Sequence, residues 1–332
     1  MAGTFYKGNE LDTTTKEQLA NKIINKITIQ RIDSNVFDNP FNVFKKHELE
    51  AGNQIEEIET ANLTSEDFDP TGAETLAKKE MDFKALYHKI NREKTMKATV
   101  SDKQLSKASL SPANTASLAN AIATEMSNSS QIEDYEAFKQ LLKDIAHENK
   151  NMVICDLNGN STKVDAITKG IQILGTKMTF PSTQYNYSGY KKAFSRKNDL
   201  VLISDATMKA RINVDSLAGA FNVDKKALVD NWIVIDEMPE IEFNGTTTDK
   251  GLEIDIGEDN KIIMHKYNEE GEETVTGKGI MILLDKRAII DDPVERVITE
   301  QYNAKGRFTN KYLHATDILS YSTLKNAIIL VD

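Results

Sequence analysis

The charge of this sequence reverses sign within one long stretch near its start, and this reversal constrains the fold more than any other feature. Residues 48–80 contain ten acidic residues and two lysines, a net charge of −8, whereas residues 81–107 contain seven basic and three acidic residues, a net of +4. The Asp-Pro-Thr-Gly sequence at 69–72 is typical of a turn. Apolar residues alternate with polar ones at 96–100, which indicates a strand. We therefore predict a two-stranded arm at residues 53–100 with an acidic and a basic limb; a pair of solvated charged loops is the alternative.

A long helical region follows the arm. Ser111 and Pro112 combine an N-cap residue with a proline at the first helical position, which is a strong start signal. Apolar residues then recur at helical spacing, apart from a polar break at residues 127–130. Residues 111–148 are therefore predicted to form one long kinked helix or two successive helices.

From Met152 onward, short apolar runs alternate with helical patterns, which is typical of a layered α/β domain. Residues 244–276 are polar, rich in glycine and acid, and carry a short alternation, so we expect an inserted hairpin region there. The last apolar run, at residues 326–331, is expected to be a paired and buried strand. The other predicted strands are Val153–Cys155, Leu200–Ile203, Trp232–Ile235 and Ile280–Leu284.

Composition limits the class of protein. The chain has 332 residues, a length that favours about two domains, and a formal net charge of −10, which argues against a broad nucleic-acid-binding surface. Its single cysteine excludes a disulfide framework and fits a reducing compartment. No apolar run reaches the length of a membrane span, and the first twelve residues do not resemble a signal peptide. We therefore expect a soluble protein with no membrane partner.

The motifs that could carry chemistry each fail at a required position. Gly277-Lys278-Gly279 lacks the first glycine and the hydroxyl residue of a phosphate-binding loop. Residues 156–160 begin like a calcium loop, but Ser161 and Ile167 stand where glycine and glutamate are needed. Cys155 lies inside a predicted buried strand, where thiols are inert, and the five histidines lack metal-ligand spacing. The sequence thus predicts no catalytic residue, cofactor or metal site.

Two other functions remain as alternatives at this point. Asp205 and Asp236 each follow a predicted buried strand, a position where α/β enzymes place carboxylates, so a cytoplasmic α/β enzyme is one alternative. Asp205 is, however, also a natural N-cap for the segment that follows it. Aromatic residues are interleaved with basic ones at Tyr185–Arg196, so a peripheral nucleic-acid binder is the other alternative, although the net charge of −10 disfavours it. The same cluster suits an interface anchor equally well.

The order of these parts resembles a tailed-phage major capsid protein, and in particular the major head proteins of phi-29-like short-tailed phages. The most specific similarity is the run from Asp215 to Asn222. Other similar segments are Asn39-Pro40-Phe41 with Lys45-Lys46, Ile55-Glu56-Glu57-Ile58, Phe83 to His88 with Asn91-Arg92, Glu133 to Glu136, Asp199 to Ala206, Val234-Ile235-Asp236 and Asn326-Ala327.

The resemblance implies an α+β fold, the tailed-phage capsid fold of the Hong Kong 97 type. Residues 1–52 would be an N-terminal arm, 53–100 the extended β-hairpin loop, and 101–150 a peripheral domain with the spine helix. Residues 151–332 would be an axial α/β domain with the inserted loop at 244–276, and the final strands would return to the peripheral domain. No counterpart is expected for the C-terminal immunoglobulin-like domain of some relatives.

The resemblance also implies a function without catalysis. The chain would self-assemble as hexamers and pentamers into an icosahedral or prolate phage head that encloses double-stranded DNA, held without sequence specificity. Further implied partners are a scaffolding protein and a portal at one vertex, with assembly in the host cytoplasm and a final location in the virion. Because long arms with segregated charge suit contacts between identical subunits, we predict inter-subunit contacts at Glu56, Glu57, Glu59, Lys84, Lys89 and Arg92.

Overall fold

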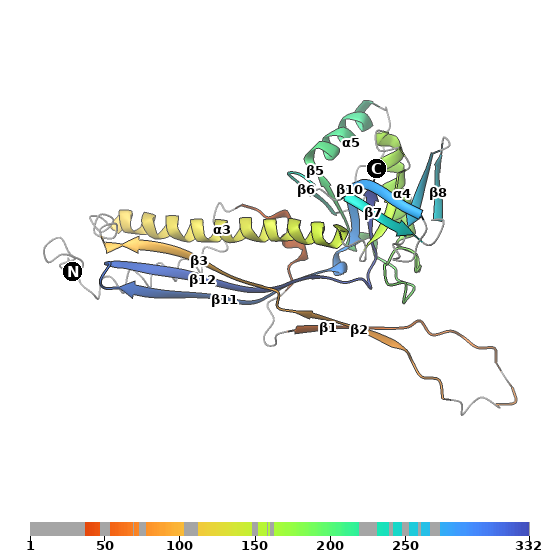
Figure 1. Ribbon diagram of the computed structural model, residues 1–332, viewed down its shortest axis with the longest axis horizontal. Helices are drawn as coiled ribbons and strands as arrows, with labels where there is room; N and C mark the ends of the chain where they lie inside the picture. Colours follow the sequence, from red (N-terminus) through yellow and green to blue (C-terminus); the bar gives the residue numbers. More distant parts are fainter. Residues whose placement is uncertain are drawn as a thin grey trace.

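Three parts of the molecule radiate from a common junction: a layered α/β unit, a long helix lying on a narrow sheet, and a two-stranded arm (Figure 1). The protein is seen in a computed structural model. It describes residues 37–46, 54–68, 70–72, 78–102, 112–147, 152–157, 159, 163–218, 231–238, 242–247, 252–257, 260–265 and 273–331.

The spine is a single helix, α3 (Pro112–His147), 36 residues long. The sequence left open one kinked helix or two, because residues 127–130 are polar. The helix continues because polar side chains here meet the segment around the short 3-10 helix η1 (Pro40–Phe44). Asn128 Oδ1 accepts a hydrogen bond from the Phe37 N–H at 3.1 Å, and Gln131 Oε1 accepts one from the Asn42 amide at 3.4 Å.

A three-stranded antiparallel sheet, which we call the peripheral sheet, runs beside α3 (Figure 1). Its order is β11 (Ile289–Asn303), β12 (Phe308–Tyr321) and β3 (Arg92–Ser101). The alternation at residues 96–100 was correctly interpreted as a strand, but its placement in the arm was wrong, because β3 pairs with β12. Its Met96 and Ala98 contribute to a cleft shared with Ala121 and Ile122 of α3.

The arm is the antiparallel hairpin of β1 (Gln54–Thr60) and β2 (Phe83–Lys89), with Ile58 opposite Ala85. Beyond these strands the chain extends away from the rest of the molecule (Figure 1). The arm is therefore two-stranded as predicted, but its second limb ends at Lys89 rather than at Val100. The segments 69 and 73–77 near its turn lie outside the described residues.

The α/β unit is built on an eight-stranded sheet with the order β6-β5-β10-β13-β4-β9-β8, with β7 also paired to β10. The last strand, β13, lies between β10 and β4, and all five of its residues are buried. The prediction of a paired and buried C-terminal strand is thus confirmed. The bounds are β4 (Val153–Asp156), β5 (Leu200–Asp205), β6 (Asn231–Ile235), β7 (Glu242–Thr247), β8 (Leu252–Gly257), β9 (Asn260–His265), β10 (Glu273–Asp285) and β13 (Ala327–Val331).

Two apolar clusters cover the faces of this sheet. On one face, residues such as Ile282 and Ile329 pack with Phe41 of η1 and Phe138 of α3, so the core joins the α/β unit to the spine. On the other face, Leu283 and neighbouring residues pack against helices α4 (Val164–Lys177) and α5 (Ala206–Ala218). The inserted region supplies β8 and β9, a hairpin that extends the sheet beyond β4. Residues 219–230, which contain part of the most specific sequence similarity, lie outside the described residues.

Candidate inter-subunit contact sites

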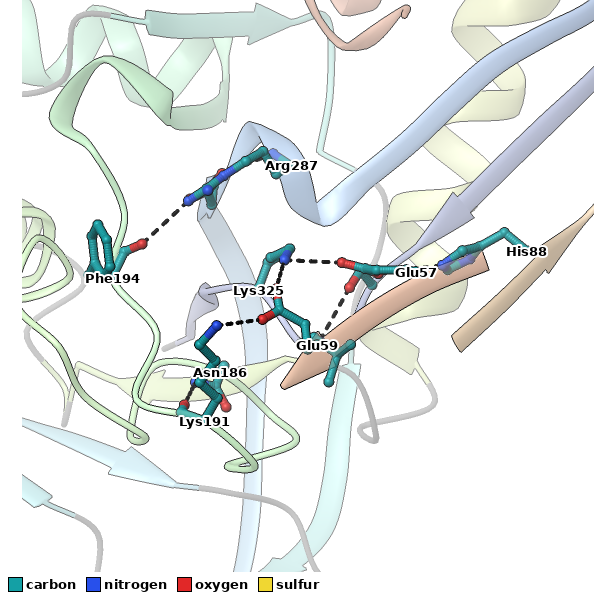
Figure 2. A network of polar contacts seen from close by, with 11 residues as sticks. Glu57, Glu59, His88, Asn186, Lys191, Phe194, Arg287 and Lys325 are labelled. Carbon is teal, nitrogen blue, oxygen red and sulfur yellow. Dashed lines mark hydrogen bonds and ion pairs between the residues drawn. The ribbon is translucent and has the colours of Figure 1, made fainter. Parts of the chain in front are cut away.

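The base of the arm is fixed to the body by ion pairs (Figure 2). Alternate residues of β1 point to one side, and this places Glu57 and Glu59 against the turn between β12 and β13. Lys325 in that turn contacts both carboxylates, with 3.2 Å between its Nζ and Glu57 Oε1. The second oxygen of Glu59, Oε2, lies 2.9 Å from Lys191 Nζ. Two of the predicted contact residues therefore already have cationic partners in their own chain.

The acidity of these two carboxyls reflects the same contacts. Burial by itself would raise the pKa of Glu57, but hydrogen bonds from His88 and Ser322 and the charge of Lys325 outweigh it and lower the pKa to about 2. Burial would also raise the pKa of Glu59, but hydrogen bonds from Lys325 and Lys191 outweigh this effect and lower the pKa. Both groups are therefore charged at neutral pH, and the base of the arm is an ion-paired joint.

His88 extends this joint toward the peripheral sheet. Its side chain is buried, its Nδ1 lies 2.9 Å from Ser320 Oγ of β12, and its Nε2 lies 3.5 Å from Glu57 Oε2. A polar chain thus runs from β12 through β2 to β1. This chain fixes the direction in which the arm leaves the body.

The other predicted contact residues differ in their surroundings. Glu56 and Lys89 are exposed on the face of the arm opposite the joint, and Glu56 accepts a hydrogen bond from the Tyr87 hydroxyl at 2.7 Å. Lys84 is half-buried and lies opposite Glu59, so it shares the face of the arm that carries the joint. Arg92 instead lies mostly buried at the start of β3, in contact with Asp134 of α3 and 3.4 Å from Asp317 of β12.

Arg92 belongs to a buried charge cluster that joins η1, the spine and the peripheral sheet. Arg296 Nη2 lies 2.8 Å from Asp317 Oδ1, and Lys45 Nζ lies 2.7 Å from Asp134 Oδ2. Because these charges are desolvated, each depends on its partners. The sequence showed no sign of this cluster, since its members are far apart along the chain and none belongs to a motif.

The arm also exposes large apolar side chains. Phe68 is 91% exposed, Leu63 72% and Phe83 65%, and Ile58 and Tyr87 are also exposed. Singly exposed apolar residues are common, but several on one projecting hairpin form a candidate interaction surface. A hairpin of two strands is also only marginally stable alone.

The residues of the alternative functions have structural roles. The Met208 N–H donates to Asp205 Oδ1 at 2.6 Å, so Asp205 is the N-cap of α5, as expected. Asp236 accepts a hydrogen bond from the Tyr135 hydroxyl and lies 3.2 Å from Lys139 Nζ, so it joins β6 to the spine. Cys155 is fully buried, and this burial raises the pKa of its thiol. In the stretch Tyr185–Arg196, Lys191 contacts the arm as described above.

Within the described ranges, no group of three or more histidine, cysteine, aspartate or glutamate side chains could hold a metal ion. None of the helices in that part of the chain is both long enough and apolar enough to cross a membrane.

Comparison with solved structures defines the class of protein. The chain resembles the capsid structure of Staphylococcus phage Andhra with a TM-score of 0.66 and 14% sequence identity, over 90% of this chain and 85% of that one. The fold is therefore the tailed-phage capsid fold of the Hong Kong 97 type, as predicted. The family model described as Phi29-like phage major capsid protein matches residues 6–331. The chain belongs to this family.

Curated relatives agree with this family. The chain is 25% identical to the major capsid protein of Bacillus phage GA-1 over 327 residues, which are 97% of this chain and 62% of that protein. It is 26% identical to the major capsid protein of Bacillus phage PZA over 97% of this chain and 65% of that protein. The chain thus spans somewhat less than two thirds of the length of these relatives. The family is one of structural proteins, not of enzymes.

Proposed function

We propose that this chain is the shell-forming subunit of a tailed-phage head and assembles in many copies, as hexamers and pentamers, around double-stranded DNA. The observation that carries the proposal is the arm: its base is fixed by ion pairs, and its outer part projects from the body with exposed apolar side chains. An isolated subunit leaves this surface in water, whereas a neighbouring copy covers it.

The same proposal includes partners and location that follow from the family. A scaffolding protein during assembly, a portal at one vertex and packaged DNA on the inner surface complete the particle. The subunits assemble in the host cytoplasm and remain in the virion. Membership in the Phi29-like family supports these partners.

The predicted contact residues are divided by their surroundings. We retain Glu56 and Lys89 as inter-subunit contacts, because both are exposed on the face of the arm opposite the joint. Lys84 is half-buried on the same face as Glu59, so we do not retain it. Glu57 and Glu59 instead hold the arm in position, and Arg92 holds the spine to the peripheral sheet. These three residues then affect assembly indirectly, because they hold the arm and the spine in the positions that assembly needs.

Electron microscopy of the purified protein, expressed with its scaffolding protein, tests the proposal. We expect closed shells from the wild type. A matched variant replaces residues 61–82 with a short glycine linker between β1 and β2, which keeps the paired strands and the joint at their base. This variant should be folded by circular dichroism and form no shells. A wild type that stays monomeric at every concentration, or a shortened variant that assembles normally, would contradict the proposal.

A further inference from the structure

The spine helix α3 borders an apolar cleft on the side that faces β3. The cleft has a volume of about 310 Å³ and lies at an edge of the peripheral sheet, because β3 pairs with β12 alone in the described part of the chain. Two of its lining residues are methionines, whose flexible side chains adapt to the shape of a partner. The full lining is Met96, Lys97, Ala98, Ala121, Ile122, Glu125, Met126 and Ser129.

The charge around this cleft is acidic. Of its two charged lining residues, Lys97 is directed to the ring of Tyr312, with 5.9 Å between its Nζ and the ring centroid, whereas Glu125 is exposed. Residues 112–138 of α3 contain four acidic residues and no lysine or arginine. A partner that covers the cleft should therefore be both apolar and basic.

The solvent face of α3 continues the cleft. Its members are spaced by four, three and four residues, so they lie on one side of the helix: Glu125, Ser129, Ile132 and Glu136. Ile132 is 46% exposed, although it is a large apolar residue. Because Glu125 and Ser129 also line the cleft, the two features form one surface, which we call the spine surface.

The chain enters the described structure beside the spine surface. Residues 1–36 lie outside the described residues. Phe37, which follows them, is held on α3: its N–H donates to Asn128 Oδ1 at 3.1 Å, and its ring meets that of Tyr135 edge-on, with 5.4 Å between the centroids. Asn128 and Tyr135 stand one turn before and after Ile132 on the helix. The residues before Phe37 therefore start at the margin of the spine surface.

The sequence before this point has the matching chemistry. Residues 13–32 contain four basic residues and one acidic residue, a net charge of +3. Leu19, Ile23 and Ile27 recur every four residues, which predicts one apolar face on a helix. Two lysines, also four residues apart, border this face. A basic amphipathic helix of this kind suits an acidic surface with an apolar groove.

We propose that residues 16–27 form an amphipathic helix that docks on the spine surface of its own chain, with its apolar face in the cleft and its lysines beside Glu125. The nine residues between Ile27 and Phe37 can span up to about 30 Å, which is enough to cross α3 and reach the cleft. Apolar contacts provide most of the attraction, and the opposite charges orient the helix. The docking is a property of the single chain and does not depend on the proposed function.

Oxidation of Met96 in the unassembled full-length chain tests the docking. The protein is treated with dilute hydrogen peroxide, and each methionine is followed by mass spectrometry. Ile23→Asp/Ile27→Asp should speed the oxidation of Met96 about tenfold, because the cleft loses its cover. Two methionines calibrate the measurement: Met81 is 51% exposed and should react quickly in every variant, and Met281 is fully buried and should stay protected while the body is folded.

Asn21→Asp/Asn25→Asp is the matched control. It adds the same charge on the opposite face of the predicted helix, so Met96 should stay as protected as in the wild type. Equal oxidation of Met96 in all three proteins would overturn the proposal. Protection that appears only at high protein concentration, or only when a second protein is added, would also overturn it, because the occupant would then be another copy or a separate partner.

Crosslinking identifies the occupant independently. The variant Ile23→Cys/Ala121→Cys is treated with a short bismaleimide at low protein concentration; the native Cys155 is buried and does not compete. We expect a link within one chain, found by mass spectrometry in protein that still runs as a monomer on a denaturing gel. Asn25→Cys/Ala121→Cys should link much more slowly. Links between chains only, or equal rates for the two variants, would contradict docking within the chain. Shell formation is measured separately, so failure of the proposed function would leave this result unchanged.

Discussion

Lys325 has the most consequential single position in the arm joint. Its side chain lies between Glu57 and Glu59, and all three side chains are less than one fifth exposed. Removing the ammonium group would leave two partly buried carboxylates with fewer opposite charges near them. This loss costs more free energy than the loss of an exposed ion pair.

We expect Lys325→Met to lower the free energy of unfolding by about 1–3 kcal/mol, because methionine retains the volume but not the charge. Urea denaturation at pH 7 measures this loss. Lys89→Met is the matched control, since Lys89 is an exposed lysine on the same arm, and its effect should stay within about 0.5 kcal/mol. Equal effects of the two variants would show that the joint adds no stability.

Asp291 shows the opposite electrostatic behaviour to Glu57. It lies on β11 at the edge of the buried charge cluster, near Lys45, Arg92, Asp134 and Asp317. Burial is the largest influence, and it raises the pKa of Asp291 from 3.8 to about 6, partly opposed by the charge of Lys45. A raised carboxyl pKa means that the group favours the folded state when protonated, and that this contribution is lost as the pH rises through about 6.

Replacing Asp291 with asparagine should therefore stabilise the protein above pH 6. We expect Asp291→Asn to raise the free energy of unfolding at pH 7 by about 1–3 kcal/mol and to have little effect near pH 4. Denaturation curves at several pH values between 4 and 7 measure the difference. A variant that is less stable than the wild type at pH 7 would show that the carboxylate is well paired in this cluster.

At the scale of elements, strands were easier to predict than their partners. The alternation of Met96, Ala98 and Val100 reflects one buried face, and local sequence is enough to show it. Its partner β12 lies more than 200 residues farther along the chain, and no local pattern specifies that pairing. The polar residues at 127–130 suggested a kink or a break, but α3 is continuous. Asn128 and Gln131 accept hydrogen bonds from residues near η1, which are distant in the sequence.

The candidate site was predictable to a similar extent. The Glu57 and Glu59 spacing, two residues apart on a strand, indicates one shared face. The residue that faces them, Lys325, is 266 positions from Glu59 and belongs to an ordinary turn. The segregation of charge along the sequence was thus enough to locate the arm. Only the fold shows which of its acidic residues are paired within the chain.

The C-terminal strand is the element on which the α/β unit depends most. β13 pairs with β10 on one side and β4 on the other, and its side chains enter both apolar clusters. Deleting residues 326–332 should therefore give insoluble protein rather than folded, unassembled subunits. The soluble fraction after expression and its circular dichroism measure this outcome.

A point variant separates burial from strand pairing. Ile329→Ala keeps the strand but removes buried methyl groups, so we expect it to lower the free energy of unfolding by about 2–5 kcal/mol. Ile132→Ala on α3 is the control, because Ile132 is 46% exposed whereas Ile329 is fully buried. Folded, soluble subunits after the deletion would show that the sheet closes without β13.

For the whole molecule, charge acts at two distances. Each copy carries a net charge of −10, so copies repel one another at long range, but salt at about 0.15 M already screens charges more than about 8 Å apart. Ion pairs in direct contact are screened less. Repulsion between whole copies therefore matters most in dilute salt. In more concentrated salt, short-range pairs made by exposed groups such as Glu56 and Lys89 matter more.

We expect assembly to weaken as sodium chloride rises above about 0.15 M, because exposed pairs worth only about 0.2–1 kcal/mol each recur at every contact of a closed shell. Glu56→Gln should unfold like the wild type, since this side chain is exposed, yet assemble less readily and respond less to salt. Light scattering of both proteins against salt concentration measures these effects. Glu57→Gln/Glu59→Gln is the contrasting variant, because it loosens the joint and should lower stability before assembly begins. If all three proteins assemble equally well at every salt concentration, the charge of the arm has no part in holding the shell together.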